Sequence, residues 1–111
     1  MSKPPIAKKT RAELREEALR PSPSLGYDRD ILAVHLIKCG SFALAEAQLR
    51  RAIWLNPFES LFKLHLAQCL QRLKRTPEAR ECLARVLARD PDNVPAQRLL
   101  ARLDSLASSP E

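Results

Sequence analysis

The strongest constraint on this chain is an internal period of 34 residues. When the sequence is shifted by one period, residues of the same type fall on one another. The matching sets are Leu32, Leu66 and Leu100; Ala33, Ala67 and Ala101; Leu36 and Leu70; Ala45 and Ala79; Leu49 and Leu83; Arg51 and Arg85; and Pro57 and Pro91. Such a period indicates a structural unit that stacks on copies of itself, because one unit is too short to bury a core alone.

The segments between the matched positions favour helices. The chain has only 2 Gly among its 111 residues and is rich in Ala, Leu, Arg and Glu, which have high helix propensity. Pro57 and Pro91 each follow a helical stretch and are expected to end it, because proline lacks an N–H and disfavours helix at the preceding residue. Five helices are predicted, near residues 26–39, 42–55, 59–73, 76–89 and 93–107.

Residues with special backbone preferences stand at the predicted helix ends. Gly40 is expected to end the first helix, because glycine readily adopts the left-handed conformation that closes a helix. Ser41 is expected to cap the next helix through its side-chain oxygen. Thr76 is interpreted in the same way for the fourth helix, with Pro77 at its first position.

The period, the helix pairs, the Leu-Ala pair in each first helix, the single Ala early in each second helix and the closing Pro resemble the tetratricopeptide repeat family. The resemblance covers about residues 23–107 and implies an all-α fold, with antiparallel helix-turn-helix repeats stacked as a short right-handed solenoid. The expected organisation is a basic N-terminal arm with a short helix at 1–22, repeats near 24–57 and 58–91, a capping helix at 93–107 and a frayed tail at 108–111.

Two and a half repeats leave the N-terminal side of the first helix pair open. We interpret residues 10–20 as a degenerate second helix that docks on this side through Leu14, Ala18 and Leu19. Ala18 falls on Ala52 one period later, which supports this interpretation. The alternative is a disordered arm.

Small and large apolar residues are expected to share the packing. Alanines at the helix crossings let the backbones approach closely, and these are Ala33, Ala45, Ala67 and Ala79. Leucines are expected to fill the space around those crossings, and these are Leu32, Leu36, Leu49, Leu66, Leu70 and Leu83. The three cysteines, Cys39, Cys69 and Cys82, are interpreted as buried free thiols, since their spacing suits neither a zinc site nor a disulfide framework. A reducing cytoplasm is therefore the expected location.

The resemblance implies that the first helix of each repeat lines a concave groove. The residues expected there, at three- and four-residue spacing, are Tyr27, Asp30, Val34, Leu61, Leu64, Gln68, Gln71, Arg98 and Arg102, with Ile37 or Lys38 and Pro95 beside them. Four of them, Tyr27, Val34, Leu61 and Leu64, form an apolar patch, and Arg98 and Arg102 form a basic end. This surface predicts a partner peptide or helix with apolar anchors and an acidic end. The alternative occupants are the protein's own N-terminal arm and a second copy.

Two other surfaces are candidates for interaction. Trp54 and Phe58 form a secondary surface at the end of the second helix, because a Trp is a common binding anchor and Ala88 replaces it one period later. The alternative is that the two rings pack on each other. A basic arm of Lys8, Lys9, Arg11 and Arg15 belongs to an overall net charge of +6 and could attract nucleic acid or acidic lipid. Interrupting glutamates and the lack of interleaved aromatic residues do not favour that use.

The sequence contains no pattern of residues that indicates enzymatic activity. The only two imidazoles are those of His35 and His65, and His35 falls on Cys69 one period later, which indicates a packing position. The two glycines stand apart and form no phosphate-binding loop. No catalytic residue, metal ligand or cofactor is predicted.

The prediction for function is a non-catalytic adaptor or scaffold that binds another protein in its groove. The alternatives are a small dedicated chaperone or assembly factor, and binding of nucleic acid or acidic lipid through the basic arm. A homodimer is also considered, formed through the Leu-rich last helix with Leu99, Leu100, Leu103 and Leu106. The side chains that grip a chaperone tail's terminal carboxylate in one subset of the family are not matched, since Asp30 and Val34 stand at such positions.

Overall fold

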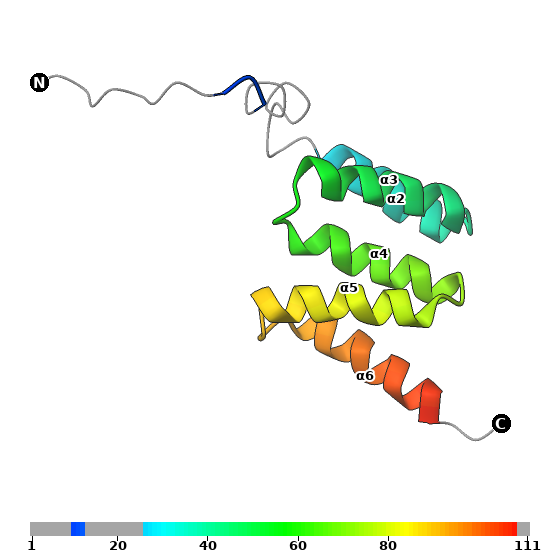
Figure 1. Ribbon diagram of the computed structural model, residues 1–111. Helices are drawn as coiled ribbons and strands as arrows, with labels where there is room; N and C mark the ends of the chain where they lie inside the picture. The colour runs from blue at the N-terminus through cyan, green and yellow to red at the C-terminus, as the bar shows by residue number, and fades with distance from the viewer. Residues whose placement is uncertain (1–9, 13–25, 109–111) are drawn as a thin grey trace, which may run out of the picture.

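The computed structural model describes residues 10–12 and 26–108, and it shows five helices stacked in chain order (Figure 1). They are α2 (Tyr27–Lys38), α3 (Phe42–Leu55), α4 (Ser60–Arg72), α5 (Thr76–Arg89) and α6 (Val94–Ser108). Helices α2 and α3 form one antiparallel pair and α4 and α5 the next, while α6 packs on α5. The described residues contain no strand. The expected all-α arrangement of stacked helix pairs is therefore confirmed.

The turns within the two helix pairs share the same backbone conformation and the same hydrogen bond. Gly40 has a φ of 82° and Lys74, one period later, a φ of 64°. In the first turn the backbone N–H of Ser41 donates to Leu36 O at 2.8 Å, and in the second that of Arg75 donates to Leu70 O at 2.9 Å. This bond satisfies a helix-end carbonyl and needs a left-handed residue before the donor.

The turn between repeats also recurs, including a bond from a side chain. Lys63 Nζ donates to the carbonyl of Pro57 at 2.5 Å. One period later Gln97 Nε2 donates to the carbonyl of Pro91 at 2.6 Å. Each bond ties the start of a first helix to the proline that follows the helix before it, so the period in the sequence is reproduced in the hydrogen bonds.

The helix caps differ from the sequence prediction. Ser41 stands at the N-cap of α3, but its side chain makes no capping hydrogen bond. Thr76 is the first residue of α5, so the cap position belongs to Arg75 and Pro77 lies within the first turn. The observed side-chain caps are at the N-termini of α4 and α6, whereas they were predicted at those of α3 and α5. Glu59 accepts from the N–H of Leu61 at 3.1 Å at the start of α4, and Asn93 accepts from that of Ala96 at 3.0 Å in the first turn of α6.

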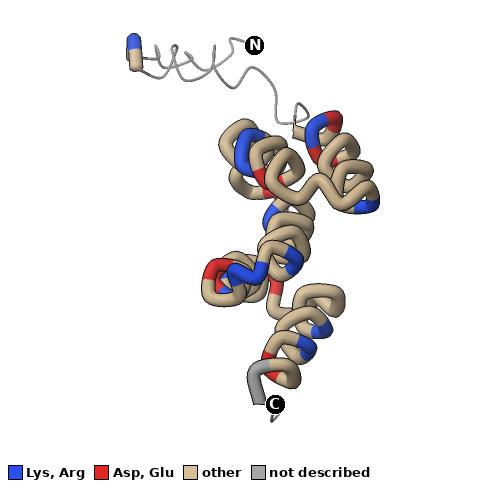
Figure 2. The backbone as a smooth tube through the Cα atoms, turned by 90° about the vertical axis from the view of Figure 1, so that its right-hand side faces the viewer, with Lys and Arg blue, Asp and Glu red and all other residues tan. Residues whose placement is uncertain are grey.

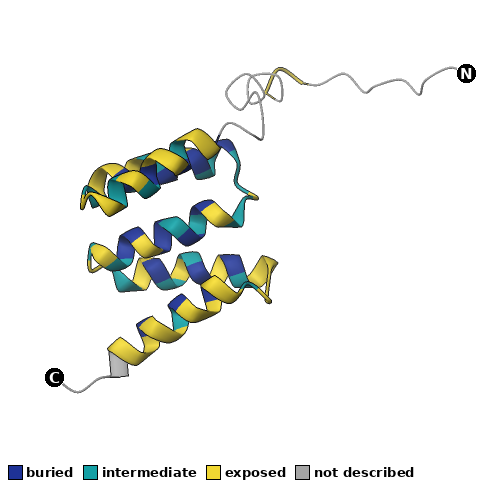
Figure 3. Cartoon of the chain, turned by 180° about the vertical axis from the view of Figure 1, so that it is seen from behind, coloured by how far each residue is buried: buried dark blue, intermediate teal, exposed yellow. Residues whose placement is uncertain are grey.

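The core runs between the helices, and α4 contributes the most buried residues to it (Figure 3). Most of the predicted core residues are buried, namely Ala33, Ala45, Ala67, Ala79, Leu49, Leu66, Leu70 and Leu83. Leu36 is partly buried against them. The prediction for Leu32 was wrong, because this side chain is 45% exposed. Its partner position in the second repeat, Leu66, is covered by the preceding helix pair, and the described residues include no such pair before α2.

An aromatic contact that the sequence analysis did not identify closes the N-terminal end of the core. Phe62 is fully buried, and its ring lies edge-on to that of Tyr27, with 5.1 Å between the centroids. A side chain at Gly26 would come within 2.7 Å of Phe62 Cζ and 3.1 Å of Ala52 O. The absence of a side chain at Gly26 thus lets α2 begin directly against the ring.

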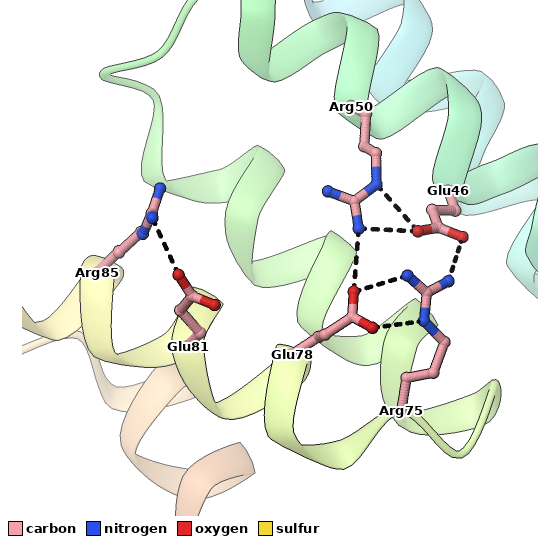
Figure 4. A network of polar contacts seen from close by, with 6 residues as sticks. All are labelled: Glu46, Arg50, Arg75, Glu78, Glu81 and Arg85. Atoms are coloured by element: carbon pink, nitrogen blue, oxygen red, sulfur yellow. Dashed lines mark hydrogen bonds and ion pairs between the residues drawn. The ribbon is translucent and has the colours of Figure 1, made fainter.

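A four-residue ion network joins the two repeats (Figure 4). Arg75 donates to Glu46 at 2.7 Å and to Glu78 at 2.6 Å. Arg50 donates to Glu46 at 2.9 Å and reaches Glu78 at 3.4 Å. Burial alone would raise the pKa of Glu46, but the hydrogen bonds from Arg75 and Arg50 outweigh it and hold that pKa below its usual value. Hydrogen bonds from Arg75 also lower the pKa of Glu78.

The ion network predicts a loss of stability in acid. Because the folded-state pKa of Glu46 is lowered, its contribution is complete above the pKa of the unfolded chain and is lost as the pH falls through the lower folded-state value. The unfolding temperature is therefore expected to drop between neutral pH and about pH 3, and to drop less in Glu46→Gln. Thermal unfolding followed by circular dichroism measures both. An equal drop in the two proteins would contradict a role of this carboxylate in the pH dependence.

Candidate protein-binding groove

A concave pocket lies on the side of the stack formed by α2, α4 and α6. It encloses about 370 Å³, and its lining residues are Ile37, Gln68, Gln71, Arg72, Pro95, Arg98, Leu99 and Arg102. Ile37 comes from the end of α2, the two glutamines and Arg72 come from the last turns of α4, and the others come from α6. The first helices of successive units therefore build the pocket together.

The pocket lining is basic and partly apolar. Three of its lining residues are arginines, and none is acidic. Arg98 and Arg102 lie one helical turn apart on α6, where their side chains are exposed, and basic positions occur on each of the five helices (Figure 2). Among the described residues neither of these two arginines forms an ion pair. The guanidinium of Arg72 lies over the ring of Phe42, at 5.1 Å from the centroid. Such a site suits carboxylates attached to a partly apolar segment.

A comparison with models of known protein families identifies the repeat. The model of the tetratricopeptide repeat matches residues 36–103, which is more than half of the chain. The chain belongs to the tetratricopeptide repeat family. No curated protein and no solved structure matches it. Tetratricopeptide repeats generally mediate protein–protein interaction and are typically non-catalytic.

The pocket of this tetratricopeptide repeat protein contains only part of the predicted groove set. Gln68, Gln71, Arg98 and Arg102 line it, together with Ile37 and Pro95. Two further residues, Arg72 and Leu99, line the pocket without having been predicted. Arg72 lies four residues after Gln68 on the same helix, so the helical spacing could have identified it.

Asp30 does not offer a free carboxylate to the groove. It is buried, and His65 Nδ1 on α4 donates to its Oδ1 at 2.6 Å. This bond connects α2 to α4, and it satisfies a carboxylate that would be costly to bury without a partner. The prediction of Asp30 as an exposed groove residue was therefore wrong. The same hydrogen bond accounts for the partly buried position of His65.

The predicted apolar patch is smaller than expected. Leu64 is buried in the core, so it is not a surface anchor. Val34 is half-buried, while Tyr27 and Leu61 are exposed at the other end of the helices, where Tyr27 donates to Glu59. None of these four side chains lines the pocket. The hydrogen bond to Glu59, followed by burial, raises the pKa of Tyr27.

The secondary surface at Trp54 and Phe58 carries arginines on both rings. Arg51 lies over the Trp54 ring at 4.5 Å from its centroid, and Arg89 lies over the Phe58 ring at 4.6 Å. Phe58 is 68% exposed, so it remains accessible to a partner. Cation–π contacts of this kind hold the side chains in place at the surface.

The remaining predicted features are placed only in part. Cys69 is buried as expected, but Cys39 is exposed and Cys82 is intermediate, so the prediction of three buried thiols was wrong for Cys39. Of the basic arm, Arg11 is described and exposed. The predicted docking residues Leu14, Ala18 and Leu19 lie outside the described residues, and so do the other cations of the arm, which are Lys8, Lys9 and Arg15.

Two absences concern the part of the chain that the structure describes. No helix in it is long and apolar enough to cross a lipid bilayer. Residues 10–12 and 26–108 contain no group of three or more His, Cys, Asp or Glu side chains placed to hold a metal ion. The homodimer through the last helix stays a prediction; of its four leucines, Leu99 and Leu103 are buried, Leu100 is partly buried and Leu106 is exposed.

Proposed function

We propose that this protein is a non-catalytic adaptor or scaffold of the cytoplasm, and that it binds an acidic peptide or helix in the pocket between α2, α4 and α6. The observation that carries the proposal is the composition of the pocket, which has three arginines, two glutamines and no acidic residue. The membership in the tetratricopeptide repeat family supports protein binding in general.

The geometry supports a helix or an extended segment rather than a small molecule. The pocket is lined from three helices and lies along the end of α4, with Ile37, Pro95 and Leu99 as its apolar contacts. An acidic segment can place carboxylates against Arg98 and Arg102 while an apolar side chain covers Pro95. Ion pairs with arginine are geometrically specific, so they favour carboxylates over other acceptors. The adaptor role is proposed because tetratricopeptide repeats generally mediate protein–protein interaction.

The proposal is tested by capture of partners from a lysate of the native cell. Wild type and Gln68→Ala/Gln71→Ala are compared after circular dichroism has shown that both are helical. We expect a protein with an acidic segment to be retained by the wild type and reduced for the variant. Equal retention by both proteins would contradict binding in this pocket, and a partner lost only on removal of residues 1–22 would support the basic arm instead.

A further inference from the structure

The contact between the two repeats shows which residues a repeat presents to the helix before it. Arg50 and Ile53 of α3 line a cavity of about 190 Å³ together with residues of α4 and α5. The second repeat contributes to this lining, among others, Lys63, Leu66, Glu78, Glu81 and Arg85. One period earlier the same positions form a face on α2 and α3. We call it the open end face and define it by Arg29, Leu32, Leu44, Ala47 and Arg51.

The open end face presents large apolar side chains to solvent. Leu32 is 45% exposed, whereas Leu66 at the same position of the second repeat is 3% exposed. Leu44 is 62% exposed. In the part of the chain that the structure describes, no helix precedes α2 to cover these two leucines. A stack of repeats needs an element with a polar outer side to cover each apolar end, so an occupant of this face is expected.

In the second repeat, the charges at these positions are balanced by ion pairs. Arg85 donates to Glu81 at 3.0 Å on the same helix. Glu78 reaches Arg50, which α3 brings to the contact, at 3.4 Å. The incoming helix therefore supplies a cation, and the repeat that receives it supplies the carboxylates.

The open end face has kept the cations of this contact and lost its carboxylates. Arg29 and Arg51 stand where the second repeat has its lysine and arginine, but Leu44 and Ala47 replace the two glutamates. Arg29 donates to the amide of Gln48 at 3.0 Å. Within residues 10–12 and 26–108, neither Arg29 nor Arg51 forms an ion pair. The face is therefore apolar and basic, and an incoming segment that complements it must be apolar and acidic.

The segment that precedes α2 along the chain has this composition. Glu16 stands one period before Arg50, so the position that brings a cation to the second repeat holds a carboxylate here. Leu19 stands one period before Ile53 and keeps the apolar contact. Residues 13–19 contain three glutamates and one arginine, so this part of the N-terminal arm is acidic. The connection from Leu19 to α2 is at least as long as that from Ile53 to α4.

We propose that residues 13–19 of this chain, which lie outside the described residues, dock on the open end face in the place that α3 takes on the second repeat. Glu16 then lies among the cations Arg29 and Arg51, and Leu19 covers Leu32. A second copy docked through the same face would instead bring like cations together. A segment of the same chain also has a high effective concentration, which a separate partner lacks.

This docking closes the N-terminal end of the stack, as α6 closes the other end by burying Leu99 and Leu103. No residue of the open end face lines the pocket between α2, α4 and α6. The proposal therefore goes beyond the proposed function and does not depend on it.

The test is alkylation of the thiol introduced by Leu44→Cys in the full chain, with each modified residue identified by mass spectrometry. We expect this thiol to react at least about 10-fold more slowly than in the same chain with Glu16→Arg/Leu19→Arg, because a docked segment must open before the reagent enters. Adding Arg51→Glu alone should raise the rate. Adding Glu16→Arg to Arg51→Glu should lower it again, because the exchange of the two charges restores the ion pair.

A matched position and a concentration series keep the test specific. Leu106 is 61% exposed and lies near the end of α6, so the thiol introduced by Leu106→Cys should react at one rate in all these backgrounds. Circular dichroism should show equal helix content throughout. Three results would overturn the proposal. They are equal rates at position 44 with and without Glu16→Arg/Leu19→Arg, protection that grows with protein concentration and so indicates a second copy, and protection that appears only when another protein is added.

Discussion

Replacing Phe62 with alanine is expected to lower the free energy of unfolding by about 3–5 kcal/mol, the usual cost of removing a fully buried phenylalanine. The ring is completely enclosed and lies against Tyr27 and the backbone at Gly26. A chain of this size has a total stability of roughly 5–15 kcal/mol, so the variant should lose much of it. Urea unfolding followed by circular dichroism measures the change.

The chain offers a matched control four residues away. Phe58 is 68% exposed, and its contact with Arg89 is the main interaction that Phe58→Ala removes. The expected cost is less than about 1 kcal/mol. If the two alanine variants were equally destabilised, the assignment of Phe62 to the core and of Phe58 to the surface would be wrong.

The second large effect concerns binding. Reversing two charges in Arg98→Glu/Arg102→Glu is expected to weaken binding of an acidic partner by about 2–3 kcal/mol, or roughly 30- to 150-fold, because two attractive contacts become repulsive. Titration calorimetry with the partner captured by the wild type measures this change. The stability should remain close to that of the wild type, since both side chains are exposed and form no ion pair among the described residues.

The control for this charge reversal lies on the neighbouring helix. Arg85 and Arg89 on α5 have the same four-residue spacing and are exposed, but neither lines the pocket. Arg85→Glu/Arg89→Glu changes the net charge by the same amount. It should therefore weaken binding only through the general field of the protein, which salt screens. Equal losses in the two variants would indicate nonspecific attraction to a basic protein.

The helices could be predicted from the sequence because strong local signals mark their ends. The predicted limits 42–55 and 76–89 agree with α3 and α5, and the others differ by one residue at each end. Pro57 and Pro91 follow the second helices, and Gly40 closes a first helix with a positive φ. Lys74 adopts the same conformation without being glycine, so residue type alone did not reveal the second of these turns.

The errors came from contacts that depend on neighbours in space. Leu32 lies one period before the buried Leu66, so the period predicted that Leu32 is buried too. Leu66 is covered by the helix pair before it, but the described residues contain no helix pair before α2, and Leu32 is therefore exposed. Leu64 was assigned to the surface, yet α4 has helices on several sides and buries it. The pairing of Asp30 with His65 joins residues 35 positions apart, and no spacing within one helix predicts such a contact.

The central claim is that a partner binds between α2, α4 and α6, and the most direct test is a map of the bound surface by nuclear magnetic resonance. Isotope-labelled protein is titrated with the captured partner or its acidic segment. We expect the largest shifts at Ile37, Gln68, Gln71 and Arg98, which line the pocket. Shifts that instead cluster on α3 and α5, around Arg50 and Arg85, with the pocket signals unchanged, would contradict the claim.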